Sequence, residues 1–137
     1  MLVGAEGELG VLETVALHLR SVVACDRATI ILVEEGTGNP LMKYSHGGGN
    51  DGPEEQVIRA GLTAGRPVAL SVPKASAVPS TLGVSRHVLL VPLTADDRKL
   101  GLLALEREPI HSPFDQVELK LAAIAGTHLT TFLTGVV

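Results

Sequence analysis

Two apolar runs joined by a short charged turn constrain the fold more than any other feature of this chain. The runs RHVLLVPL (86–93) and GLLALERE (101–108) flank the polar segment TADDRKL, a pattern that is typical of an antiparallel β-hairpin. The segment SPFDQVELKLAAIAG (112–126) follows, and its Ser-Pro-Phe-Asp start predicts an N-capped amphipathic helix. Both runs are apolar almost without interruption. We therefore expect helices on both faces of the sheet.

The remaining segments predict two more helices and three more strands. Apolar periodicity predicts a first helix from Leu9 to Val23, and Pro53 opens a short second helix that ends at Gly65. The expected strands are rich in β-branched and apolar residues and are bounded by turn signals: Asp26 to Glu35, Leu41 to His46 and Pro67 to Val72. The strand at 41–46 is the more polar and suits a sheet edge. A loop is expected from Pro73 to Ser85.

The order helix, two strands, helix, three strands, helix is an α+β pattern with one antiparallel sheet, and residues 1–137 are predicted to form a single domain. Three short motifs resemble the signature of GAF domains, which are small sensory modules of bacterial signalling proteins. They are Val91-Pro92-Leu93, Leu100-Gly101-Leu102-Leu103 and Pro113-Phe114-Asp115. The resemblance covers the chain from about Leu12 to Phe132.

This resemblance implies a GAF/PAS-like fold with the N- and C-terminal helices on one sheet face. The middle helix and the Pro73 to Ser85 loop would close a pocket over the other face. It also implies a non-catalytic regulatory module of a signal-transduction or transcription-regulating protein. Such a module binds a small effector, relays binding through its terminal helices and has neighbouring effector domains in a longer native protein. The alternative is a ligand-free GAF-like domain that serves only in dimerisation or docking.

Charge and composition limit the partners that we expect. The net charge is −4 and the 11 lysines and arginines are scattered along the chain, so the sequence shows no basic face for nucleic acid. No apolar run approaches the ~18 residues of a membrane span, and the first residues lack a secretory signal. The sequence thus predicts no nucleic-acid or membrane partner and a cytoplasmic location.

Candidate effector-binding residues are polar groups on otherwise apolar strands, because such groups fix the orientation of a ligand. They are Ser45, His46, Ser71, Ser85, His87 and Thr94. His46 and His87 are the best placed of the five histidines to bind haem or a metal, but a strand-end histidine that is hydrogen-bonded to backbone or solvent is the favoured explanation for both. No histidine spacing indicates a local metal site, and the sequence names no cofactor.

Other motifs give little support for catalysis or nucleotide binding. The run Gly47 to Gly52 formally fits G-x-G-x-x-G, but the acidic residues beside it favour a turn with an acidic helix cap. No serine lies in a G-x-S-x-G elbow or another recognisable activating context. Cys25 is the only cysteine, which argues against the thiol chemistry of the GAF-like methionine sulfoxide reductases and against bilin attachment. The N-K-F-D-E motif of cyclic-nucleotide-binding GAF domains is absent.

Each terminal helix carries a largely apolar stripe whose members are three or four residues apart. The stripes are Leu9, Leu12, Ala16, Leu19 and Val23, and Val117, Leu121, Ile124, His128 and Phe132. Packing on the sheet is one explanation. Pairing in a homodimer is the other, and the GAF resemblance implies a dimer bundle of this kind.

Overall fold

The computed structural model describes residues 5–34, 36–47, 55–73 and 84–134. In these ranges the elements follow in the order expected from the sequence. They are α1 (Ala5–Val22), β1 (Arg27–Val33), β2 (Pro40–Gly47), α2 (Glu55–Ala64), β3 (Val68–Pro73), β4 (Val84–Ala95), β5 (Arg98–Arg107) and α3 (Gln116–Leu133).

One antiparallel sheet carries the five strands in the order β2-β1-β5-β4-β3. Within the β4–β5 hairpin, β5 is the central strand of the sheet and β4 lies beside it. Strand β2 lies at an edge, as its polar sequence predicted. The hairpin turns at Asp96, whose φ of 53° lies in the left-handed region that aspartate tolerates better than most residues. The α+β prediction with a single antiparallel sheet is confirmed.

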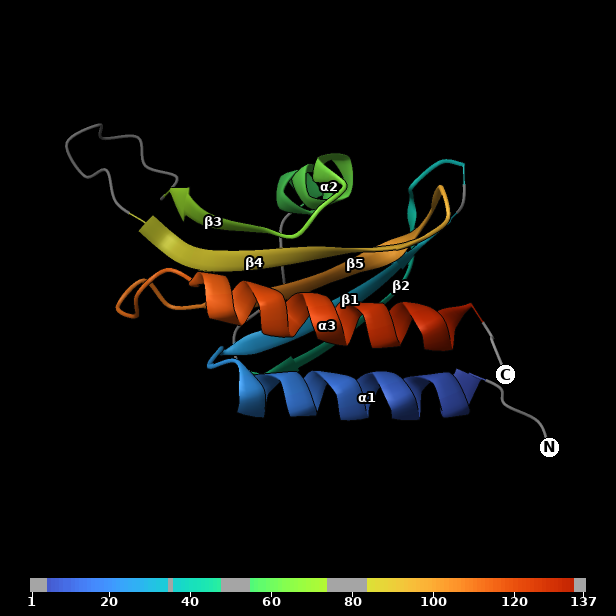
Figure 1. Cartoon of the computed structure of the whole chain (residues 1–137), viewed down its shortest axis with the longest axis horizontal. Helices are drawn as coiled ribbons and strands as arrows, with labels where there is room; N and C mark the ends of the chain where they lie inside the picture. The colour runs from blue at the N-terminus through green and yellow to red at the C-terminus, as the bar shows by residue number, and fades with distance from the viewer. Residues whose placement is uncertain (1–4, 35, 48–54, 74–83, 135–137) are drawn as a thin grey trace.

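Helices cover both faces of the sheet (Figure 1). Strand alternation sends Leu103 and Leu105 into a core beneath α1 and α3, whereas Leu102 and Ala104 enter a second core beneath α2. All four residues are fully buried. The nearly continuous apolar runs of the hairpin are therefore explained by two buried faces, as the sequence predicted.

Glycine allows two helices to approach the sheet closely. A Cβ atom on Gly126 of α3 would lie 2.7 Å from Val91 Cγ1, and one on Gly61 of α2 would lie 2.8 Å from Leu102 Cδ1. Neither position could take a larger residue without displacing its helix or the strand side chain.

The predicted cap of the last helix is confirmed. Asp115 Oδ1 accepts a hydrogen bond from Glu118 N at 2.8 Å, and Glu118 Oε1 accepts one from Asp115 N at 2.9 Å. Other boundaries differ from the prediction. Helix α1 begins at Ala5 rather than Leu9, and the expected loop is shorter because Pro73 belongs to β3 and Ser85 to β4. The rest of that loop, 74–83, lies outside the described residues, as do positions 48–52 of the glycine-rich run.

Candidate functional site

A group of polar side chains lies on the α2 face of the sheet. This polar cluster comprises Arg27, Thr29, Ser45, Arg86 and Glu106, of which Arg27, Thr29 and Glu106 are buried, Arg86 is half-buried and Ser45 is exposed. Arg27 is the direct cross-strand partner of Glu106. Arg86 Nε lies 2.6 Å from Glu106 Oε2, and the hydroxyl oxygens of Thr29 and Ser45 are 2.9 Å apart.

Burial makes the charges of this cluster costly. Arg27 is 6% exposed and Glu106 is 7% exposed, and withdrawing such ions from water costs several kcal/mol each before pairing offsets the loss. Glu106 Oε1 is buried and accepts no hydrogen bond in the described structure. A buried carboxylate oxygen without a donor is rare in folded proteins. Glu106 Oε1 can therefore accept a further hydrogen bond.

Strand alternation divides the predicted site residues between the two faces. Ser45 lies in the polar cluster, but His46 points to the opposite face, where its Nδ1 lies 3.1 Å from Nη1 of Arg20 in α1. Ser71 and His87 lie together on β3 and β4, apart from both of these places, with Ser71 Oγ 2.8 Å from His87 Nδ1.

The two remaining predicted residues lie elsewhere. Thr94 is exposed near the β4–β5 turn, opposite Lys99, and Ser85 belongs to β4 with its side chain outside the described part of the structure. The described side chains of the predicted set therefore do not converge on one pocket, because neighbouring residues of a strand face opposite sides.

The hydrogen bonds of His87 leave neither of its ring nitrogens open as a ligand for haem or a metal. Both ring nitrogens of His87 are engaged, Nδ1 by Ser71 and Nε2 by the carbonyl oxygen of His111 at 3.0 Å. A metal at His87 would have to displace one of these partners. Within the described ranges, no three His, Cys, Asp or Glu side chains are grouped so that they could hold a metal ion.

Sequence analysis overlooked most of the polar cluster. Arg27, Arg86 and Glu106 stand at the ends of apolar strand segments, where a charged residue reads as the exposed boundary of the strand. The signal that could have found them is the register: Arg86 and Glu106 lie two positions from Val88 and Ala104 of the core beneath α2, and Arg27 lies four positions from Ile31. An even separation along a strand places all three on that face.

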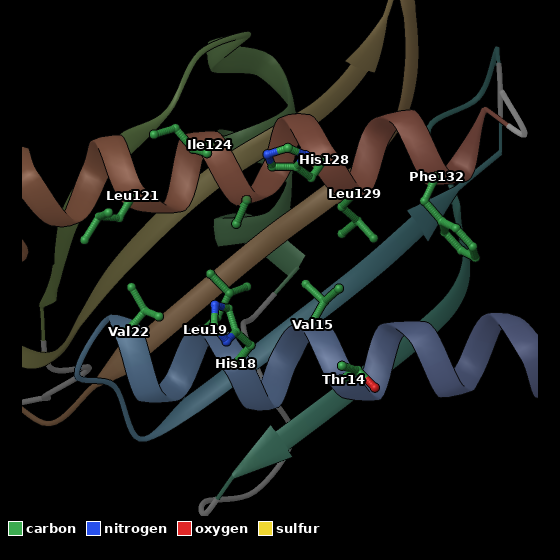
Figure 2. Close-up of a pocket in the computed structure, with 11 residues that line it drawn as sticks. Thr14, Val15, His18, Leu19, Val22, Leu121, Ile124, His128, Leu129 and Phe132 are labelled. Carbon is green, nitrogen blue, oxygen red and sulfur yellow. The ribbon is translucent and has the colours of Figure 1, made fainter. Parts of the chain in front are cut away.

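A second site is an apolar groove between α1 and α3, which run side by side (Figure 2). This α1/α3 groove has a volume of about 430 Å³ and is lined by Thr14, Val15, His18, Leu19, Val22, Leu121, Ile124, Ala125, His128, Leu129 and Phe132. None of these lining residues is an Asp, Glu, Lys or Arg. The groove therefore offers an apolar surface with two imidazoles and no fixed charge.

The apolar stripes of the two terminal helices differ in what they contact. On α1 the residues Leu12, Ala16, Leu19 and Val23 are buried against the sheet, so packing on the sheet is confirmed for that helix. On α3 it is Ala122, Gly126 and Leu129 that are buried. Sheet packing was the wrong explanation for Val117, Leu121 and Ile124, which are 65%, 37% and 57% exposed.

Cys25 lies in the turn between α1 and β1 and is partly buried. Burial raises the pKa of its thiol to about 11 from an ordinary value of 9.0, and this effect outweighs the positive charge of Arg20, which lowers the pKa. A neutral thiol is a poor nucleophile and a poor metal ligand at neutral pH. The geometry gives no support to chemistry at this cysteine.

The sequence pattern that defines the GAF domain matches residues 9–131. The chain therefore belongs to the GAF domain family, whose members are typically sensory domains of signalling proteins. No curated protein matches it in sequence. No helix in the described ranges is long and apolar enough to cross a bilayer.

Solved structures of GAF domains share this fold. A GAF domain/HD domain protein from Geobacter sulfurreducens is similar with a TM-score of 0.70 and 15% identity over 98% of this chain and 97% of that chain. The blue-light absorbing form of the PixJ GAF domain from Thermosynechococcus elongatus is similar with a TM-score of 0.66 and 16% identity over 97% and 88% of the two chains. These likenesses establish the fold.

Proposed function

We propose that this chain is a non-catalytic sensory module of a cytoplasmic signalling or transcription-regulating protein, and that it binds a small effector on the α2 face of the sheet. The polar cluster around buried Glu106 carries the proposal. Its unpaired Glu106 Oε1 calls for a donor that the described residues do not supply. An effector with a hydrogen-bond donor beside an apolar body fits a face whose other residues are apolar.

A physical path leads from this cluster to the terminal helices. Glu106 and Arg107 are neighbours in β5 and point to opposite faces of the sheet. Arg107 donates hydrogen bonds to Ala24 O beyond α1 at 3.0 Å and to Glu118 of α3 at 2.7 Å. A displacement of Glu106 on effector binding would shift Arg107 and with it both terminal helices. The effector would then bind one arrangement of the helices more tightly than the other, which is what a relay requires.

Thermal-shift screening with metabolites, nucleotides and haem tests the effector site. An effector at about 100 times its Kd stabilises the domain by about 2.7 kcal/mol. Glu106→Gln retains the shape and removes the charge, so we expect it to abolish the shift. The matched control is Glu55→Gln on α2, whose side chain is 74% exposed and should leave the shift unchanged. A folded wild-type protein that responds to no compound would contradict effector binding and leave the docking alternative.

The α1/α3 groove favours a second role, homodimerisation through the terminal helices. A two-fold dimer places the same patch of both copies face to face, so the patch must be apolar or self-complementary. The groove meets this condition because its lining has no fixed charge. Exposed Val117 extends the groove along α3, with the spacing of a coiled-coil seam to the lining residues Leu121 and Ile124. The side chain of Leu17 adds exposed apolar area on α1.

Sedimentation of Ile124→Asp tests the dimer. We expect the wild-type protein to sediment as a dimer and the variant as a monomer. Ile110→Asp is the matched control, because Ile110 is 81% exposed but lies in the segment between β5 and α3. Leu12→Asp, which the sequence alone suggests, is unsuitable because Leu12 is fully buried and its loss would unfold the domain. A wild-type monomer would rule out this role.

A further inference from the structure

Ser71 and His87 form a direct cross-strand pair between β3 and β4, with Ser71 Oγ 2.8 Å from His87 Nδ1. The other ring nitrogen, Nε2, lies 3.0 Å from the carbonyl oxygen of His111. A carbonyl oxygen can only accept, so in the neutral imidazole Nε2 carries the hydrogen and Nδ1 carries a lone pair. The Ser71 hydroxyl therefore donates to the basic nitrogen.

This arrangement has the three parts of an activated nucleophile: a hydroxyl, a base within hydrogen-bond distance and a third group that orients the base. Ser71 is exposed on edge strand β3, whereas His87 is 5% exposed and held at both nitrogens. Described hydroxyls on the terminal helices donate to backbone carbonyl oxygens and not to a base. Ser21 donates to the carbonyl oxygen of His18 at 2.7 Å, and Thr127 to that of Ala123 at 3.1 Å.

We propose that Ser71 is a base-activated hydroxyl that accepts an acyl group from an activated ester or thioester. The Ser71 oxygen attacks the acyl carbonyl carbon while its proton moves to His87 Nδ1. The bond from the acyl carbon to the leaving oxygen or sulfur then breaks with its electron pair, and His87 returns the proton to that atom. The products are an ester on Ser71, a free alcohol or thiol, and an unchanged His87.

The carbonyl oxygen of His111, which orients His87, sets the expected acceleration of Ser71 acylation. General-base assistance contributes about 10²- to 10⁴-fold, and a carbonyl oxygen stabilises the imidazolium less than a carboxylate does, so we expect about 100-fold. The reaction is a stoichiometric modification without turnover. It is also independent of the effector proposal, because Ser71 and His87 lie on the sheet face opposite the polar cluster.

Acetylation of the whole chain by p-nitrophenyl acetate near pH 8 tests the proposal. Intact mass spectrometry follows the gain of one acetyl group, and peptide mapping locates it. Cleavage by alkaline hydroxylamine distinguishes a serine ester from a lysine amide. We expect Ser71 to be the fastest-labelled hydroxyl and Ser71→Ala to abolish that ester. Ser21→Ala is the matched control and should leave the rate unchanged.

His87→Gln should lower the rate of Ser71 acetylation about 100-fold. Circular dichroism and thermal unfolding establish that this variant is folded. If it is not, the labelling rates of Ser71 and Ser21 in the wild-type protein decide. The proposal is overturned if Ser71 is labelled no faster than Ser21, or if folded His87→Gln retains the wild-type rate.

Discussion

Arg107 forms a bidentate ion pair with Glu118 that ties the last strand to the last helix. Arg107 Nη1 lies 2.7 Å from Glu118 Oε2, and Arg107 Nη2 lies 3.0 Å from Glu118 Oε1. The same Glu118 carboxylate closes the capping box with Asp115. One side chain therefore both begins α3 and fixes its position on the sheet, which explains why a capping sequence directly follows the hairpin.

The remaining contacts of Arg107 gather three chain segments at one point. Arg107 donates to the carbonyl oxygens of Ala24, Ser112 and Pro113 at 2.8 to 3.0 Å. Its guanidinium carbon lies 4.0 Å from the centroid of the Phe114 ring, within range of a cation–π interaction. Pro113 and Phe114 of the Pro-Phe-Asp motif thus contact one buried arginine, and Asp115 contacts the glutamate that pairs with it.

We predict that Arg107→Ala destabilises the domain by about 3 to 5 kcal/mol, because it leaves Glu118 and three carbonyl oxygens without their donor. Chemical denaturation measures the loss. Arg59→Ala is the matched control: the Arg59–Glu55 pair is similarly short at 2.8 Å, but its side chains are 70% and 74% exposed, so we expect a loss below about 1 kcal/mol. Equal losses for the two variants would show that the Arg107 network does not anchor α3.

Two glycine substitutions should change stability in opposite directions. Gly126→Ala gains about 1 kcal/mol of helix propensity, but its Cβ would lie 2.7 Å from Val91 Cγ1, and such overpacking costs about 1 to 3 kcal/mol. Val91 is buried and β-branched, so it cannot move aside easily, and we expect net destabilisation. Gly10→Ala meets no atom within 4 Å and should stabilise α1 by up to about 1 kcal/mol.

Thermal unfolding of the two single variants measures these opposite effects. The double variant Gly126→Ala/Val91→Ala should recover part of the strain, which a double-mutant cycle reveals as coupling. Stabilisation by Gly126→Ala comparable with that of Gly10→Ala would mean that α3 does not approach the sheet as closely as described.

The raised pKa of Cys25 predicts slow alkylation. With a pKa of about 11 instead of 9.0, the folded chain has about 100-fold less thiolate at pH 8 than the unfolded chain. The rate with iodoacetamide should rise about tenfold per pH unit until about pH 11, and denaturant should remove the protection. Because the unfolded thiol ionises first, stability from this group is lost as pH rises above 9.0. Rapid alkylation of folded protein at pH 8 would contradict the burial.

Local patterns determined much of the fold, and the sequence therefore predicted it well. The hairpin, the edge strand β2 and the cap at Asp115 each depend on residues close together in the chain. What covers the α3 stripe was harder to predict, because the spacing of Leu121 and Ile124 is the same whether a sheet or a second helix packs on them. Only the packed structure shows that Gly126, which has no side chain, lies against the sheet instead.

The candidate sites depend on strand register, which local patterns do not determine. A shift of one residue moves a side chain to the other face, and this difference separates Ser45 from His46. The Ser71–His87 pair likewise exists because β3 and β4 align those two residues. The sequence predicted a role for both residues but gave no indication that they contact each other.

The hairpin itself yields the last prediction. Leu103 is fully buried at the centre of β5, where it pairs with Ile30 of β1 and Val91 of β4. Leu103→Ala should therefore cost about 2 to 5 kcal/mol through lost burial and the cavity that remains. A domain of this size has only about 5 to 15 kcal/mol of stability, so the variant should unfold at much lower denaturant concentration.

Asp97→Ala provides the control within the same hairpin. Asp97 is exposed in the two-residue turn next to Asp96, whose backbone carries the left-handed conformation. Removing the Asp97 side chain leaves that conformation in place, so we expect a loss below about 1 kcal/mol. Denaturation midpoints of the two variants, compared at equal m-values, measure the difference. A turn substitution as damaging as Leu103→Ala would mean that the turn, and not the doubly covered strands, holds the sheet together.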